Sequence, residues 1–444
     1  MSRLLRRTLP LLVPALALAA LFAAPASASR YVSIDGGKAA GPSTYDEVFV
    51  DKHGPKRAKT VLVMIPGTGG GSGSVDPIAR DLSRRIKGLQ VWGFDRRSQA
   101  FEDTSAFEAG DAEAAADYYL GFNYDRVAGS DVPFVSNWGF ATEMKDLHEV
   151  IERASRGGTR KVILGGHSRG ASSVVAYAAW HFAGDGAGYN DLDGLVLIDG
   201  GLAAFGPQEF SLADAKAGLD EIRGGAFFND PLGAGIPEIG PIFSELAALF
   251  ARVDPEGPSI LQDNPLVQGA GLSPPFDVTN EGFVGYLFDP TYSPLGASLR
   301  FRAGRLTDGP EPRGWVDGES VPIQDFAKAF SGEPGNATEW YYPRRMVLDT
   351  AAANALKRTP AAKFLNLRLF HAKRIDTPLY AFQTELTNGG VLAGAETVIA
   401  NSRIERSRLV DASRGTSHLD PVLAPTRSNR FTQTVIPFLR RIAR

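Results

Sequence analysis

A serine between two glycines is the strongest candidate for chemistry in this chain. Residues 166–170 read Gly-His-Ser-Arg-Gly, which places Ser168 at the centre of a Gly-x-Ser-x-Gly pattern. An apolar run at 161–164 precedes the pattern and small residues follow it, so we expect a strand, a sharp turn and a helix. Such a turn holds a serine hydroxyl at a helix N-terminus, where the helix dipole favours developing negative charge. Ser168 is the predicted nucleophile. Glycine is predicted to be required at Gly166 and Gly170, because a Cβ at either position would collide with the neighbouring strand or helix.

A second glycine-rich segment, Pro66-Gly67-Thr68-Gly69-Gly70-Gly71, follows the apolar run at 60–65. Together with the Ser168 pattern it resembles the α/β-hydrolase superfamily, and the segment itself is similar to the Pro-Gly-Thr-Gly loop of some lipases. The resemblance covers most of residues 55–200 and 375–440. It implies a serine, acid and histidine triad in that chain order, and an oxyanion hole made of the backbone amides of Thr68 and Arg169. A phosphate-binding loop is the rival interpretation of these glycines, but the Gly-Lys-Ser/Thr ending is missing.

The base and the acid of the implied triad come from the second half of the chain. His418 lies in a loop between the last predicted strand and a final helix, which is where the resemblance places the triad histidine. Glu385, at the carboxyl end of the strand predicted at 378–382, is the first choice of acid to orient that imidazole. Asp199, which ends the strand predicted at 194–198, is the alternative, because some lipases carry the acid there. The side chain of Arg169 is expected to pair with a nearby carboxylate, with an acidic substrate group as the alternative partner.

The elements around these residues predict an α/β fold. Short Val-, Ile- and Leu-rich runs that end in Gly or Asp alternate with helical patterns, as in a mostly parallel, doubly wound sheet covered on both faces. The alternation stops after Gly201, and residues 202–370 contain an amphipathic helix at about 241–253 and a second helical stretch at about 345–357 among Gly- and Pro-rich connections. We therefore expect an α/β-hydrolase core of residues 29–201 and 371–444, with residues 202–370 forming a large, mainly helical cap. The predicted core strands are 31–34, 48–50, 60–65, 89–94, 161–164, 194–198, 378–382 and 408–410.

Composition excludes several classes of function. The 444 residues include no cysteine, so disulfides, thiolate zinc sites and cysteine nucleophiles are impossible. Lys and Arg number 47 against 50 Asp and Glu, a formal charge of −3, which gives no basic footprint for nucleic acid. The proposed triad requires neither a metal nor a cofactor, and none is predicted.

The first 28 residues have the layout of a secretory signal peptide. Three arginines precede an apolar run, and the segment ends in Ala26-Ser27-Ala28, a small-x-small cleavage pattern. An uncleaved membrane anchor is the alternative for this segment. Elsewhere no run approaches the ~18 consecutive apolar residues of a membrane span. The expected location is therefore outside the cell or in the periplasm or cell envelope.

These observations predict an exported serine hydrolase that cleaves a carboxylic ester through an acyl-enzyme, as lipases and carboxylesterases do. The cap and its apolar helix favour a small-molecule or lipid-like ester as the substrate. An amidase or peptidase could use the same triad, because the unmatched cap sets substrate choice. A non-catalytic envelope binding protein is the third hypothesis, and in it His418 and a carboxylate would fail to converge on Ser168. The oligomeric state does not follow from the sequence.

Overall fold

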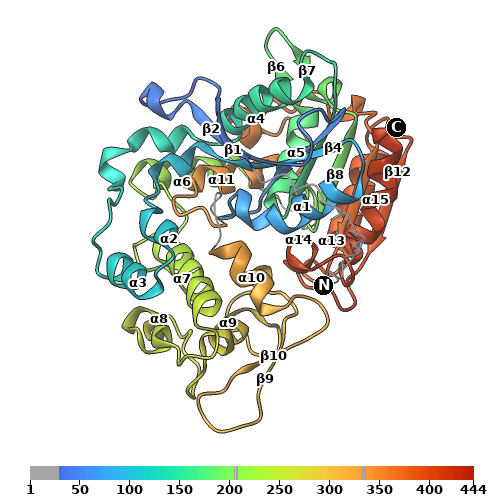
Figure 1. Cartoon of the computed structure of the whole chain (residues 1–444). Coiled ribbons are helices and arrows are strands. Elements are labelled where there is room, and N and C mark those ends of the chain that lie inside the picture. Colours follow the sequence, from blue (N-terminus) through green and yellow to red (C-terminus); the bar gives the residue numbers. More distant parts are fainter. Residues whose placement is uncertain (1–29, 205, 207–208, 332–336) are drawn as a thin grey trace, which may run out of the picture.

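The computed structural model describes residues 30–204, 206, 209–331 and 337–444. The predicted signal peptide, residues 1–28, lies outside the described residues. An eight-stranded sheet forms the centre of the molecule, in the order β1-β2-β4-β3-β5-β8-β11-β12 (Figure 1). β1 and β2 run antiparallel to their neighbours, and the six strands from β4 to β12 are parallel. The strands are β1 (Arg30–Asp35), β2 (Glu47–His53), β3 (Thr60–Ile65), β4 (Leu89–Asp95), β5 (Lys161–His167), β8 (Gly194–Ile198), β11 (Leu379–Gln383) and β12 (Ser407–Asp411).

This sheet confirms the predicted α/β fold and each predicted core strand. Every residue of β3, β4 and β8 is buried, as expected for strands covered on both faces. The chain passes from β3 to β4 in one direction along the sheet and from β5 to β8 in the other. Right-handed crossovers in opposite directions place the connecting helices on opposite faces. The helices that flank the sheet are α1 (Asp76–Arg85), α4 (Phe140–Ser155), α5 (Arg169–Ala179), α13 (Gly390–Ala400) and α15 (Arg430–Ala443), with the short α14 (Asp420–Leu423) between α13 and α15.

Helix α4 combines an expected apolar stripe with two buried acids. Met144, Leu147 and Val150 are fully buried, in agreement with their helical spacing. Glu143 and Asp146, on the same helix, are also buried, at 3% and 2% exposed. Carboxylates buried to this extent require ionic or hydrogen-bonding partners, and both have them, as described below.

The segment between β8 and β11 lies over the carboxyl ends of the parallel strands. Figure 1 shows α7, α9 and α10 on one side of the sheet, with β9 and β10 farthest from it. α7 (Ile239–Val253) matches the first helix predicted in this segment, and α11 (Arg344–Ala353) matches the second but ends four residues earlier than predicted. The other α-helices and strands among the described residues of this segment are α6 (Leu212–Arg223), α8 (Pro265–Gly269), α9 (Asn280–Phe288), α10 (Ile323–Phe330), α12 (Pro360–Phe364) and the hairpin of β9 (Gly304–Leu306) and β10 (Trp315–Asp317).

A second stretch of chain joins this helical layer. The connection between β4 and α4 contains α2 (Ser105–Ala109) and α3 (Ala112–Leu120), and α3 packs against α7. The ring of Tyr119 on α3 stands edge-on to Trp340, with centroids 5.6 Å apart. The helical layer over the carboxyl ends of the strands is thus built from two separate parts of the sequence. Among the described residues, no helix is both long and apolar enough to cross a bilayer.

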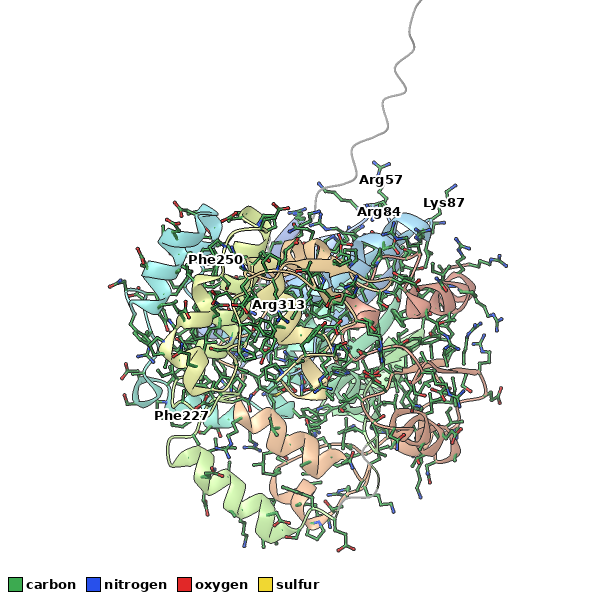
Figure 2. The ribbon with its side chains drawn as sticks, turned by 90° about the horizontal axis from the view of Figure 1, so that it is seen from below. Arg57, Arg84, Lys87, Phe227, Phe250 and Arg313 are labelled. Carbon is green, nitrogen blue, oxygen red and sulfur yellow. The ribbon has the colours of Figure 1, made fainter. Side chains whose placement is uncertain are left out.

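Exposed cations collect at the opposite, amino-terminal edge of the strands. Arg57 precedes β3, Lys87 precedes β4 and Arg84 lies in the last turn of α1. Figure 2 shows these three side chains together at one margin of the molecule. Their positive charge therefore lies away from the carboxyl edge, where Ser168 is located.

Candidate active site

Ser168 occupies a strained turn between β5 and α5. Its φ of 55° and ψ of −126° lie outside the regions that non-glycine residues favour, so close packing must hold the turn. A Cβ on Gly166 would lie 2.2 Å from the backbone of Gly170, and a Cβ on Gly170 would lie 2.3 Å from the Ile65 carbonyl oxygen. Both glycines are therefore required by close approach to a helix and to a strand, as predicted. Ser168 is partly exposed and lines a cavity.

His418 and Asp199 meet at the carboxyl edge of the sheet. His418 Nδ1 lies 2.5 Å from Asp199 Oδ2, and both side chains are almost fully buried. The carboxylate also accepts two hydrogen bonds from Thr384. The Thr384 backbone N–H donates to Oδ1 at 2.7 Å, and the Thr384 hydroxyl donates to Oδ2. Burial alone would raise the pKa of Asp199, but the hydrogen bond and charge of His418 hold that pKa below its usual range. An ionised Asp199 keeps the proton on Nδ1, which leaves Nε2 as the basic nitrogen of His418.

Glu385, the acid predicted first, does not contact His418. Its Oε1 accepts a hydrogen bond from Ser417 Oγ at 2.6 Å, and its Oε2 pairs with Arg302 at 2.7 Å in a half-exposed position. Thr384, the residue before it, fills the place beside Asp199. The chain bends after β11 at Glu385, and the carboxylate of Glu385 faces Ser417 and Arg302 instead of His418. The structure therefore places the alternative acid, Asp199, rather than Glu385 against the histidine.

His167 packs directly against His418 and supports its loop. The two rings are 4.5 Å apart at their centroids, and His167 Nε2 lies 2.9 Å from the His418 carbonyl oxygen. Because a carbonyl only accepts, His167 Nε2 carries the hydrogen. Burial and the neighbouring His418 lower the pKa of His167 well below its usual value, so this ring is neutral. A neutral His167 adds no positive charge beside the base.

The loop that carries Thr68 lies against Ser168 and is hydrogen-bonded to the segment between β8 and β11. A Cβ built on Gly67 would come within 3.0 Å of Ser168 Cβ, which measures how closely the loop approaches the nucleophile. Gly71 N donates to the Ala337 carbonyl and Glu339 N donates to the Gly69 carbonyl, both at 2.9 Å. The predicted oxyanion donors, the amides of Thr68 and Arg169, therefore belong to two segments that meet at Ser168.

A buried ion cluster of Arg96, Glu143, Arg169 and Glu339 lies beneath that loop. Arg169 Nη2 donates to Glu143 Oε1 at 2.7 Å, so the expected pairing of Arg169 with a carboxylate is confirmed. Arg96 donates to Glu143 at 2.9 Å and to Glu339 at 2.8 Å. Burial opposes ionisation of Glu143, yet Arg169 and Arg96 outweigh it and lower its pKa to about 2. The cluster contains two positive and two negative groups and is compensated internally.

Sequence reasoning missed Arg96, Glu143 and Glu339. Arg96 did offer a signal, because it follows the strand that ends at Asp95 and so lies at the same edge as Ser168. Glu143 stands beside the apolar stripe of α4, where a solvent-facing charge is the ordinary expectation. Glu339 lies in the segment for which no pattern predicted a position.

Ser168 and His418 line one cavity of about 420 Å³. Its floor includes the Thr68 loop, and its walls come mainly from the segment between β8 and β11. Of the described residues, no Lys or Arg lines it, and Glu339, its one acidic residue, is bound to Arg96. The apolar wall residues are Pro231, Leu232, Pro237, Pro241, Phe243, Leu272, Leu287, Phe288, Leu295, Leu299, Phe330, Ala337, Trp340, Tyr342, Leu419, Val422 and Leu423.

Among the described residues, one group has ligand atoms close enough together to hold a metal ion: Asp51, His53 and Asp76. His53 Nε2 lies 2.8 Å from Asp51 and 3.1 Å from Asp76, and Asp76 also pairs with Arg80 at 2.7 Å. His53 and Arg80 therefore already contact the carboxylates that a metal ion would need as ligands. None of the three residues lines the cavity that contains Ser168.

No protein-family model matches the chain, and no curated protein matches it in sequence. Its structure is similar to that of a proposed lipase from Sulfolobus solfataricus, with a TM-score of 0.50, 16% identity, and 93% of this chain and 94% of the other covered. The chain has the α/β-hydrolase fold. An esterase from Thermogutta terrifontis (TM-score 0.42, 14% identity, 94% and 100% covered) and a monoacylglycerol lipase from Paleococcus ferrophilus (0.40, 13%, 89% and 99%) are more distantly similar.

In an α/β-hydrolase the serine turn, the loop after β3 and the histidine loop all meet at the carboxyl edge of the sheet. Ser168, Thr68 and His418 occupy those three places here, on β5–α5, after β3 and after β12. Asp199 follows β8, one strand nearer to the nucleophile than β11, where the first prediction had placed the acid.

Proposed function

We propose that this α/β-hydrolase is a serine esterase that cleaves neutral, apolar carboxylic esters. The observation that carries the proposal is that His418 pairs with the buried Asp199 and lines, together with Ser168, one apolar cavity. In the proposed reaction His418 Nε2 takes the Ser168 proton while Ser168 Oγ bonds to the acyl carbon. The amides of Thr68 and Arg169 stabilise the oxyanion, and His418 then protonates the departing alcohol.

The second half of the reaction regenerates the enzyme. Water gives a proton to His418 and bonds to the acyl carbon, the Ser168–acyl bond breaks, and the proton returns to Ser168 Oγ. Ionised Asp199 stabilises the imidazolium in both halves. These steps use the side chains and amides of this chain, and no cofactor enters them.

The cavity supports the choice of substrate class. A volume of about 420 Å³ lies within the range of about 300–1,000 Å³ that small-molecule sites occupy. An apolar acyl chain is stabilised by leaving water for such walls, whereas a charged ester would find no side chain of opposite charge to pair with. Lipid-like and other apolar esters are therefore the proposed substrates, and amides and peptides are the alternative class for the same triad.

The proposed location is outside the cytoplasm, in the periplasm, the cell envelope or the medium. It rests on the arginines, the apolar run and the Ala26-Ser27-Ala28 pattern of the first 28 residues. Mass spectrometry of protein recovered from the medium or envelope tests it, since cleavage after Ala28 would leave Ser29 as the first residue.

Labelling with a fluorophosphonate probe, followed by peptide mapping, tests the enzyme proposal. We expect modification at Ser168, and loss of labelling in Ser168→Ala and in His418→Ala. A panel of matched esters and amides with short, medium and long acyl chains then separates the substrate classes. Folded protein that neither labels nor turns over esters would refute the proposal and favour a binding protein on a hydrolase scaffold.

A further inference from the structure

The two segments that supply the oxyanion donors are both attached to Glu143. Arg169, whose amide directly follows the nucleophile, donates from Nη2 to Glu143 Oε1 at 2.7 Å and from Nη1 to Oε2 at 3.1 Å. Ser173, on the same helix, donates from Oγ to Oε2 at 2.5 Å. The first turn of α5 is thereby fixed to α4 through the carboxylate of one residue.

The other segment, the loop after β3, reaches the same carboxylate through Arg96. Arg96 Nε donates to Glu143 Oε1 at 2.9 Å, and its Nη2 donates to the Pro66 carbonyl at 3.1 Å. Pro66 begins the loop that contains Thr68. Glu143 Oε1 therefore accepts from both arginines and joins the loop to the turn that carries Ser168.

We propose that Glu143 is a positioning residue that sets the geometry of the oxyanion hole, an inference that rests on the proposed ester hydrolysis. Donors in such a hole act only when held close to the place where the oxyanion develops, so a small displacement of either segment weakens the transition state. Glu143 does not line the cavity, so it has no contact with substrate to lose. Without its charge, Arg96 and Arg169 repel each other across a buried site and pull on both segments.

The chain contains a matched control one turn further along α4. Asp146 is as buried as Glu143 and pairs with Arg97, the neighbour of Arg96, from Arg97 Nε to Oδ2 at 3.0 Å. This second pair binds Gly37 and Asp46 in the connection between β1 and β2 rather than the loop after β3. Asp146→Asn therefore neutralises an equally buried acid on the same helix without touching either oxyanion segment.

The experiment compares Glu143→Gln with Asp146→Asn for ester turnover. We expect kcat to fall by about ten- to a hundred-fold in Glu143→Gln, with KM within about two-fold of wild type, and kcat to change by less than about three-fold in Asp146→Asn. Urea denaturation midpoints show whether both variants are folded under assay conditions. Ser173→Ala, which removes one hydrogen bond and no charge, is the milder variant if Glu143→Gln does not fold, with an expected kcat loss of about three- to ten-fold.

Amide hydrogen exchange in peptides covering residues 66–71 provides a readout that needs no turnover. Exchange there should be faster in Glu143→Gln, and in Ser173→Ala, than in wild type, and should be unchanged in Asp146→Asn. Equal kcat losses in the two acid variants, a change in KM alone, or unaltered exchange in this loop would each overturn the positioning role. If wild-type protein shows no turnover that depends on Ser168, the proposed function fails and the exchange comparison decides the role of Glu143 by itself.

Discussion

Replacing Asp199 with Asn should nearly abolish turnover while leaving the site assembled. In the native site Thr384 N–H donates to Oδ1, and both the Thr384 hydroxyl and His418 Nδ1 contact Oδ2. An Asn side chain must keep its oxygen toward the Thr384 N–H, because the reverse orientation would set two buried donors against each other at a cost of about 1–3 kcal/mol. Its NH₂ group then faces His418 Nδ1.

An NH₂ group at that position can only donate, so it stabilises the tautomer of His418 in which Nε2 carries the hydrogen. That tautomer has no lone pair at Nε2 to take the Ser168 proton. The corresponding change in a serine protease triad lowers kcat about 10⁴-fold, and a similar loss here would equal about 5.5 kcal/mol of transition-state stabilisation. We expect a kcat loss of about 10³- to 10⁴-fold in Asp199→Asn.

Glu385→Gln is the control for this change. It disrupts a half-exposed pair with Arg302 and weakens one hydrogen bond from Ser417, so its kcat should stay within about three-fold of wild type. The assay is steady-state hydrolysis of an ester that wild type cleaves, alongside thermal denaturation to verify folding. Turnover in Asp199→Asn within about ten-fold of wild type, or an equal loss in Glu385→Gln, would refute the assignment of the acid.

Three further predictions follow from other parts of the molecule. Gly170→Ala would place a Cβ 2.3 Å from the Ile65 carbonyl oxygen, and we expect it to lower the free energy of unfolding in urea by about 2–3 kcal/mol. At Gly269 an added Cβ would have no atom within 4 Å, so Gly269→Ala should change that free energy by less than about 0.5 kcal/mol. Similar losses in both variants would refute the packing argument. Burial raises the pKa of Glu245 to about 7, so the unfolded chain releases this proton before the folded one and the free energy of unfolding should fall as pH rises from about 4.5 to 7. Glu245→Gln should remove at most about 3 kcal/mol of that fall, and denaturation at about pH 5 and pH 8 checks it, an unchanged pH dependence being the contrary result. Leu299→Asp puts a charge on a partly exposed residue of the cavity wall, and we expect it to lower kcat/KM for long-chain esters by about ten-fold relative to short-chain esters. An unchanged ratio of these two kcat/KM values would place the acyl chain elsewhere.

Much of the fold and part of the site could be predicted from the sequence. The apolar strands are buried on both faces, so their hydrophobicity is nearly continuous and their positions could be read directly. The strained turn at Ser168 and its two glycines could be predicted because such a turn needs small neighbours at fixed spacing, which is a local requirement. The prediction of His418 as the base depends on the resemblance to α/β-hydrolases, which implies a histidine in the loop between the last strand and the last helix.

Which acid contacts His418, and which carboxylates pair with Arg96 and Arg169, were decided by the tertiary structure. Asp199 and Glu385 both follow parallel strands at the same edge, so local sequence places either one near the histidine. The path of the chain after β11 turns Thr384 toward Asp199 and Glu385 toward Arg302, and that direction depends on packing between distant loops. Glu143 and Glu339 have no local signal, because burying a charge becomes favourable only once Arg96 and Arg169 arrive from other strands and helices to compensate it.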